Sequence, residues 1–314
     1  MYFPYYAMNS PPDLSYFLDY NLLYQLESKI NFKLQWNKKN KLIINDFKIS
    51  FKYKILEQTS NLLKVQFSIE SSFIFDSSHN NIKSAMIDDY IIIAGYSSNG
   101  NIKIYNLVSK EENPYIYYSL NKKDLNFIST FIPLNIENLW DYNMKSIDSL
   151  YDKLQSLSYH FSRRKSKNRI RFNIDTACDY AETFALFSNP DYMSYDNTGG
   201  DCTNFASQIL HAGGLNLSST WKPYSKAWIR VEELYSYIIY NKLAYKINNK
   251  DFSRGTLIQF STPKLGRFFH TGFITHKLSN GEFLYCCHSY NKLNYPLSQI
   301  YPVLYPEIRG LNMY

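Results

Sequence analysis

The sequence predicts a two-domain protein of the α+β class. At 314 residues the chain is long enough to form more than one hydrophobic core. Between residues 34 and 107, apolar and polar side chains alternate with the period of two that is typical of β-strands. Residues 170–314 instead begin with helical patterns and end with short strands. We therefore expect one α+β domain over residues 1–165 and a second over residues 166–314.

The first domain is expected to be a helix followed by an antiparallel meander. Apolar residues recur at helical spacing over residues 13–33, directly after a pair of prolines. Alternating segments then predict four strands, over residues 47–53, 63–69, 90–96 and 102–105. A polar turn containing Asn-Gly joins the last two strands. This order indicates a small domain of the cystatin- or NTF2-like kind, with a packing, binding or positioning role.

A helix over residues 139–160 and a basic segment should end the first domain. Six of the nine residues from Arg163 to Arg171 are Lys or Arg. We interpret this segment as a solvated linker at the domain boundary, and the alternative is contact with an anionic polymer or with the other domain. No nucleic-acid-binding motif accompanies the segment, so we expect no nucleic-acid partner.

The central element of the second domain is a helix over residues 202–212. Two glycines precede Asp201, which is a favourable N-cap, and Gly213 and Gly214 end the helix. Cys202 is therefore the first helical residue, where the helix dipole and the unpaired amides lower the pKa of a thiol. A thiol held there is a candidate nucleophile. Two further helices are expected, over residues 172–187 and 228–239.

Short strands should follow these helices and supply a base for the thiol. They are predicted over residues 255–260, 270–276 and 283–288. His270 opens the second strand, whereas His276 on the same strand lies about 20 Å further along. His211 lies about 180° round the helix from Cys202. His270 is therefore the best candidate base.

A base of this kind needs a third polar group to orient it. His288 faces the same side of the hairpin as His270 in one strand register, and Asn291 lies opposite His270 in another. The register is not fixed by the sequence. We favour His288 as the third residue and retain Asn291 as the alternative.

A zinc site is the rival chemistry for these residues. Its ligands would be Cys202, His270, Cys286 and His288. These residues include no close ligand pair of the CxxC or HExxH type, so we expect neither a metal nor another cofactor. The four cysteines of the chain likewise show no disulfide framework.

The sequence shows no sign of export or of membrane insertion. Its N-terminus lacks the basic and apolar regions of a secretory signal, and no run of 18 apolar residues occurs. We therefore expect no transmembrane segment and a cytoplasmic location by default. The formal net charge of +7 would suit an anionic partner such as a wall polymer. The oligomeric state is left open.

Several blocks of the second half, in this order, resemble a known family. They are Gly200-Asp201-Cys202-Thr203-Asn204-Phe205-Ala206-Ser207-Gln208, Ala212-Gly213-Gly214, Trp228, the strand at 255–260, His270-Thr271-Gly272-Phe273-Ile274-Thr275, His288-Ser289-Tyr290-Asn291 and Tyr295-Pro296-Leu297-Ser298. Over about residues 170–314 the chain resembles the putative amidase domain of low-GC Gram-positive bacteria, which is similar to the NlpC/P60 and CHAP cysteine peptidases. One departure is Thr256, where these relatives often carry Asp.

The resemblance implies a papain-like core and hydrolysis of amide bonds, commonly in cell-wall (peptidoglycan) peptides. It implies Cys202 as the nucleophile, His270 as the base and His288 as the third residue. We expect the substrate groove to include Asp201, Asn204 and Trp228. If the resemblance holds, the protein would be associated with the cell wall or the spore.

A different class of function is also open. The chain could be a catalytically inactive protein that keeps this fold and binds the wall or a partner. Such a protein would bind peptidoglycan equally well after Cys202→Ala and would hydrolyse nothing.

Overall fold

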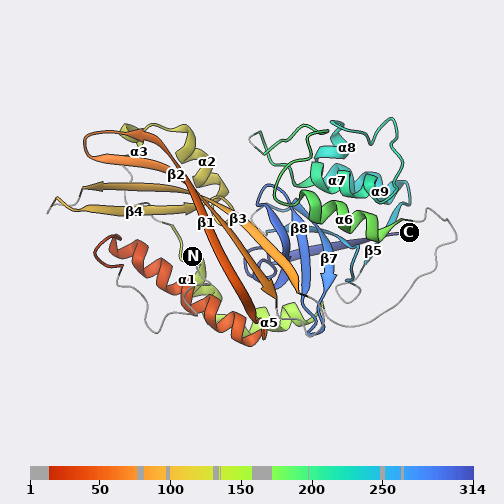
Figure 1. The fold of residues 1–314 in the computed structure, drawn as a ribbon, viewed down its shortest axis with the longest axis horizontal. Helices are drawn as coiled ribbons and strands as arrows, with labels where there is room; N and C mark the ends of the chain where they lie inside the picture. Colours follow the sequence, from red (N-terminus) through yellow and green to blue (C-terminus); the bar gives the residue numbers. More distant parts are fainter. Residues whose placement is uncertain are drawn as a thin grey trace. The chain divides into compact units, whose positions relative to one another are not determined.

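The computed structural model describes most of the chain, and its fold is mixed α+β. The described residues are 14–75, 81–96, 100–129, 134, 136–157, 172–196, 198–247, 252–262 and 265–314. The chain divides into two compact units, one of residues 1–74 with 87–147 and one of residues 75–86 with 148–314. Figure 1 labels the elements of both units. The expected boundary at 165/166, the basic segment and the end of the helix at 139–160 lie outside the described residues.

The N-terminal unit contains the predicted helix and the four predicted strands. The helix is α1 (Tyr20–Lys39), and the strands are β1 (Ile44–Gln58), β2 (Leu62–Phe75), β3 (Ile82–Tyr96) and β4 (Ile102–Ser109). Asp19 caps α1, because its carboxylate accepts a hydrogen bond from the N–H of Asn21 at 3.0 Å. The sheet order is β1-β2-β3, and β4 pairs antiparallel with β3. All four strands are longer than the sequence predicts.

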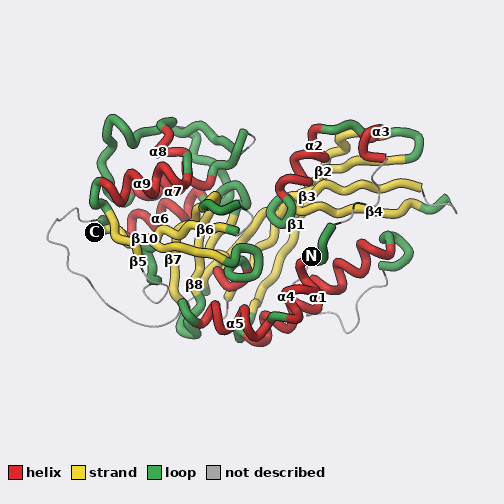
Figure 2. The backbone as a smooth tube through the Cα atoms, turned by 180° about the vertical axis from the view of Figure 1, so that it is seen from behind, coloured by secondary structure: helices red, strands yellow, loops and turns green. Residues whose placement is uncertain are grey.

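Helices cover both faces of the β3–β4 pair. Leu107 and Val108 are neighbours on β4 and therefore point to opposite faces. Val108 packs against α2 (Pro114–Lys122) and α3 (Leu125–Ile128), whereas Leu107 packs against α1. Figure 2 shows the same arrangement from behind. The helix predicted over 139–160 is interrupted at Ser146, which separates α4 (Leu139–Lys145) from α5 (Ile147–Gln155).

In the described part of the C-terminal unit, four helices lie beside an antiparallel sheet, in addition to most of α5. The helices are α6 (Ile174–Phe184), α7 (Cys202–Ala212), α8 (Lys226–Ile229) and α9 (Val231–Tyr240). The strands are β5 (Ala244–Ile247), β6 (Leu257–Ser261), β7 (Phe268–Lys277), β8 (Phe283–Cys287), β9 (Lys292–Pro296) and β10 (Glu307–Met313), with the short 3-10 helix η3 (Leu297–Gln299) after β9. Their order is β9-β8-β7-β6-β10-β5. The first residues of β3 belong to this unit and pair with β9.

The core of this unit lies between α7 and one face of the sheet. Phe205 and Ile209 of α7 are buried in one cluster with Phe273 of β7 and Cys286 of β8. Because side chains alternate along a strand, Phe273 and its second neighbour Thr271 face the helix, and His270 and Gly272 face the opposite side. Gly272 allows a close approach there, since a Cβ would lie 2.8 Å from the ring of Tyr285.

Several elements differ from the sequence-based expectation. The helix predicted over 228–239 is divided at Arg230, whose backbone is extended. The elements α2, α3, β5, β9 and β10 were not predicted. In the part of the chain that is described, no helix has the length and apolar character needed to cross a membrane.

Candidate active site

The N-terminus of α7 is built differently from the expected N-cap. Gly199 and Gly200 adopt φ values of 143° and 104°, which turn the chain into the helix. The carboxylate of Asp201 does not cap the helix. Instead the hydroxyl oxygen of Ser289 accepts hydrogen bonds from the N–H of Asp201 at 2.7 Å and from the N–H of Cys202 at 3.1 Å. A serine from the turn after β8 therefore performs the capping.

Cys202 is the first residue of α7, as predicted, but its thiol is not acidified in this structure. The side chain is buried, with 8% of the residue exposed. Burial raises the pKa of the Cys202 thiol, and this effect exceeds the opposing hydrogen bonds from the Thr203 hydroxyl and from the backbone of Thr271 and Thr203. The negative charge of Asp201 raises the pKa further. The prediction of a lowered thiol pKa is therefore wrong, because desolvation of the buried thiol has the larger effect.

The thiol lies beside the start of β7. Cys202 Sγ lies 3.7 Å from the hydroxyl oxygen of Thr203. The hydroxyl oxygens of Thr203 and Thr271 are 3.2 Å apart and link α7 to the same strand. These contacts place Cys202 near Thr271, the residue that follows His270, whereas the His270 side chain is on the other face of β7.

His270 is a buried, neutral imidazole on the other face of β7. Only 1% of the residue is exposed, and among the described residues its Nε2 has no hydrogen-bond partner. Its ring packs against Phe260, Tyr290 and Tyr305. Burial, together with the positive charge of Lys292, lowers the pKa of His270 to about 3. Within the described residues no hydrogen bond joins it to Cys202.

The described hydrogen-bond partners of His288 do not include His270, the partner that we expected. Its Nδ1 lies 2.7 Å from Asp201 Oδ2, its Nε2 lies 2.7 Å from the carbonyl oxygen of Phe184, and its ring stacks on Phe205 at 3.8 Å. Both ring nitrogens are therefore engaged, one by the Asp201 carboxyl group and the other by a backbone carbonyl. Neither nitrogen is left to orient His270.

The strand register explains this arrangement. Phe273 pairs with Cys286 across β7 and β8, and continuing that register places His288 opposite Thr271. His288 therefore shares the face of Thr271 rather than that of His270. The alternative residue, Asn291, is also directed elsewhere, since its Nδ2 donates to the carbonyl of Leu186 at 3.3 Å.

Asp201, Asn204 and Trp228 form a buried scaffold and not the lining of an open groove. They are 1%, 1% and 0% exposed. The amide of Asn204 donates to Asp201 Oδ1 at 2.8 Å and accepts from the indole N–H of Trp228 at 2.8 Å. Asp201 Oδ1 also accepts from the N–H of Tyr195. These bonds fix the first turn of α7 against the loop before it and against α8.

The residues proposed for zinc do not converge. Cys286 is buried in the core with its thiol 3.7 Å from the side-chain oxygen of Asn294. Within the described ranges, no three His, Cys, Asp or Glu side chains are placed to hold a metal ion.

Sequence reasoning missed Thr203, Thr271 and Ser289. All three lie within the blocks that carry the family resemblance, beside Cys202, His270 and His288. The only indication in the sequence that they belong to the site was that each is adjacent to one of these three candidate residues. Their contacts could not be foreseen, because Ser289 and Thr271 reach α7 from 87 and 68 residues away.

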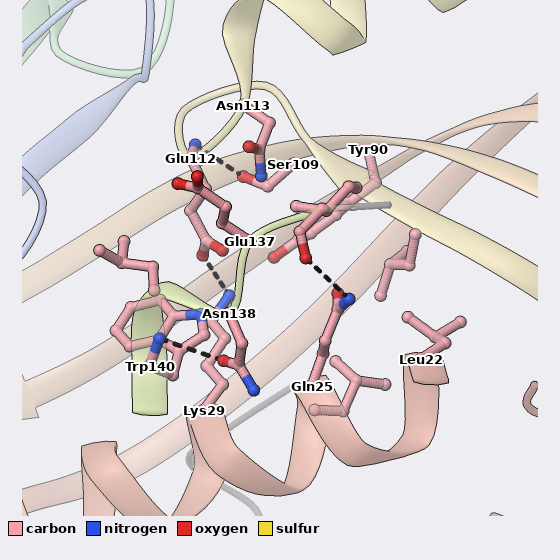
Figure 3. Close-up of a pocket in the computed structure, with 14 residues that line it drawn as sticks. Leu22, Gln25, Lys29, Tyr90, Ser109, Glu112, Asn113, Glu137, Asn138 and Trp140 are labelled. Atoms are coloured by element: carbon pink, nitrogen blue, oxygen red, sulfur yellow. Dashed lines mark hydrogen bonds and ion pairs between the residues drawn. The ribbon is translucent and has the colours of Figure 1, made fainter. Parts of the chain in front are cut away.

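A pocket in the N-terminal unit offers no comparable chemistry. It lies between α1, the end of β4 and residues 136–140 (Figure 3). Lys29 forms an ion pair with Glu112 there, and its Nζ lies 5.2 Å from the centre of the Trp140 ring. The lining contains neither a cysteine nor a histidine.

Comparisons with known proteins concern the C-terminal unit. Residues 171–308 match the family model described as a putative amidase domain. The uncharacterized protein YjcM of Bacillus subtilis is 33% identical over 138 residues, which are 38% of this chain and 31% of that protein. The uncharacterized protein YhbB of the same organism is 30% identical over 115 residues, which are 32% of this chain and 36% of that protein. The chain thus spans about a third of the length of the curated relatives that it matches. No solved structure matches significantly.

Proposed function

We propose that this chain, whose residues 171–308 belong to the putative amidase domain family, hydrolyses amide bonds with Cys202 as the nucleophile. The observation that carries the proposal is the place of the thiol. It lies at the first residue of a buried helix, near Thr271 of β7, and the residue before Thr271 is a histidine whose Nε2 is buried without a partner in the described chain. The family supports a hydrolase that acts on amides, and the nucleophile is our assignment.

In the proposed reaction, His270 is the general base. The raised pKa of Cys202 and the lowered pKa of His270 favour a neutral thiol and a neutral imidazole at rest. Proton transfer from sulfur to His270 would therefore accompany attack on the carbonyl carbon. A C–S bond forms, the C–N bond breaks, and the leaving amine takes the proton from His270. Water then hydrolyses the thioester.

The base must move toward the thiol for this reaction. Catalytic hydrogen bonds are often long in free enzymes and tighten when substrate binds. Thr271, the next residue after His270, already lies beside Thr203 on the face of β7 toward α7, and the His270 ring would have to move from the other face toward the thiol. We assign His288 and Asp201 a positioning role at the start of α7, in place of the catalytic role expected for His288.

We propose a peptide amide of the cell wall as the substrate. The net charge of +7 supports an anionic polymer as the wider partner. The helix against an antiparallel sheet supports a papain-like, NlpC/P60-like core, and the helix with a meander supports a cystatin- or NTF2-like N-terminal unit.

The experiment is digestion of purified peptidoglycan, in which the newly released amino groups are measured. We expect release by the wild-type chain, its loss in Cys202→Ala, and its retention in Cys178→Ala, a matched control because Cys178 is a fully buried cysteine whose thiol donates to the carbonyl oxygen of Thr275. Equal release by Cys202→Ala and wild type would overturn the proposed nucleophile.

A non-catalytic wall- or partner-binding protein is the second candidate. The raised pKa of the Cys202 thiol, and the lack of a hydrogen bond to His270 in the described residues, favour it. It predicts sedimentation with peptidoglycan that is unchanged by Cys202→Ala, without any release of amino groups.

A further inference from the structure

We infer that the hydroxyl of Ser289 donates the hydrogen bond that stabilises the negative oxygen formed during attack by Cys202. The inference rests on the proposed function and assigns Ser289 a catalytic role in that reaction. The N–H of Cys202 itself is engaged elsewhere, because it donates to Ser289 Oγ at 3.1 Å.

The two backbone bonds to Ser289 determine which way its hydroxyl can act. Its oxygen accepts from the N–H groups of Asp201 and Cys202, which use both of its lone pairs. Its single hydrogen is left to donate, and it has no acceptor among the residues that the structure describes. Chained hydrogen bonds polarise one another, so this hydroxyl is a stronger donor than an isolated serine.

The backbone conformations of Ser289 and of Gly200 fix the position of this hydroxyl. Ser289 has φ of 72°, a left-handed conformation that costs free energy in a residue with a Cβ. Gly200 provides the space opposite, since a Cβ there would lie 3.1 Å from Ser289 Oγ. The strained serine and the bare glycine together place the oxygen at the N-terminus of α7, where the helix dipole favours negative charge.

The location relative to the sulfur fits the role. Ser289 Oγ bonds the backbone N–H of the same residue that carries the thiol. An oxygen developing on a carbonyl carbon attacked by Cys202 would form close to that N–H group. Ser289 is half-buried, so its hydrogen can face an incoming substrate.

Two reactions of Cys202 separate this role from a structural one. Acylation by p-nitrophenyl acetate passes through a tetrahedral oxyanion, whereas alkylation by iodoacetamide is a displacement at carbon without one. Both would be measured on the full chain for wild type, Cys202→Ala, Ser289→Ala and Ser289→Gly. Glycine relieves the positive φ and alanine does not, so an effect common to both variants belongs to the hydroxyl.

We expect both Ser289 variants to slow Cys202-dependent acylation by about 10²-fold, the usual cost of one lost oxyanion donor, with alkylation unchanged. Unchanged or faster acylation would overturn the role of Ser289. Equal slowing of both reactions would also overturn it, because Ser289 would then only hold the helix. If wild type and Cys202→Ala acylate equally, the proposed function fails, and this inference with it.

Discussion

Burial affects the pKa of the Cys202 thiol more strongly than its position at the helix N-terminus does. The amides of the first turn favour a thiolate, but one of them is already engaged by Ser289 and the sulfur itself is withdrawn from water. The sequence could place the cysteine at the first helical position, because glycines and Asp201 mark that position. It could not give the pKa, because desolvation depends on the strands that pack over the thiol.

The first prediction concerns the pH dependence of alkylation at Cys202. Because burial raises the pKa of this thiol, the rate with iodoacetamide should still be rising at the pH where an ordinary cysteine is fully ionised. The Cys178→Ala background removes a competing thiol, whose pKa burial raises to about 12. A rate that is constant from mildly acidic pH upward would indicate a preformed thiolate and contradict the prediction.

The second prediction concerns His270 and acid stability. Its pKa is about 3 in the folded chain and 6.5 in the reference state, so between these values the unfolded chain binds a proton that the folded chain does not. Stability conferred by a neutral His270 is therefore full above pH 6.5 and is lost as the pH falls toward 3. From pH 7 to pH 4 the loss is about 3 kcal/mol.

Urea unfolding at pH 7 and pH 4 measures this loss, with His270→Gln as the reference. Acidification should destabilise the wild type by about 3 kcal/mol more than His270→Gln, because all other titrating groups are common to both chains. An equal loss in the two chains would show that His270 is protonated in the folded state at pH 4.

At the scale of elements, α7 was predictable and the pairing of β7 with β8 was not. Glycines at both ends of α7 are local signals, and the helix runs from Cys202 to Ala212 as predicted. The register between two strands depends on side chains that pack across the whole sheet. A shift of one residue moves every side chain to the other face, which is why His288 joins Asp201 and not His270.

The third prediction tests the pair of Asp201 and His288. Both side chains are 1% exposed, and removing one partner of their buried 2.7 Å hydrogen bond leaves the other group unsatisfied. Asp201→Asn should reduce the free energy of unfolding by about 1–3 kcal/mol. Asp191→Asn is the matched control, because Asp191 is exposed in the same loop region. Urea unfolding with similar losses in both variants would disprove a stabilising contact between Asp201 and His288.

At the scale of the whole molecule, the α+β class was predictable, but the composition of the C-terminal unit was not. Alternating and helical patterns identify strands and helices within short windows. Residues 75–86 belong to the C-terminal unit because Ala85 pairs with Leu293, a partner more than 200 residues away. No local pattern in the sequence indicates such a pairing.

The last prediction concerns a chain shortened to residues 148–314. In the full chain, Ser84 donates to the carbonyl of Asn294 at 2.7 Å, the Asn294 amide donates to the carbonyl of Lys83 at 3.3 Å, and Met86 pairs with Lys292. The shortened chain would lose these bonds and expose β9 as an unpaired edge, which favours aggregation.

We expect the shortened chain to sediment as aggregate, or to unfold at lower urea concentration than the C-terminal unit of the full chain. Ser84→Ala in the full chain provides the graded comparison, since it removes one hydrogen bond worth about 1 kcal/mol and leaves the strand in place. A soluble fragment with the urea midpoint of the full chain would show that residues 75–86 add nothing to this unit. The intermediate loss expected for Ser84→Ala separates the contribution of one side chain from that of the whole strand.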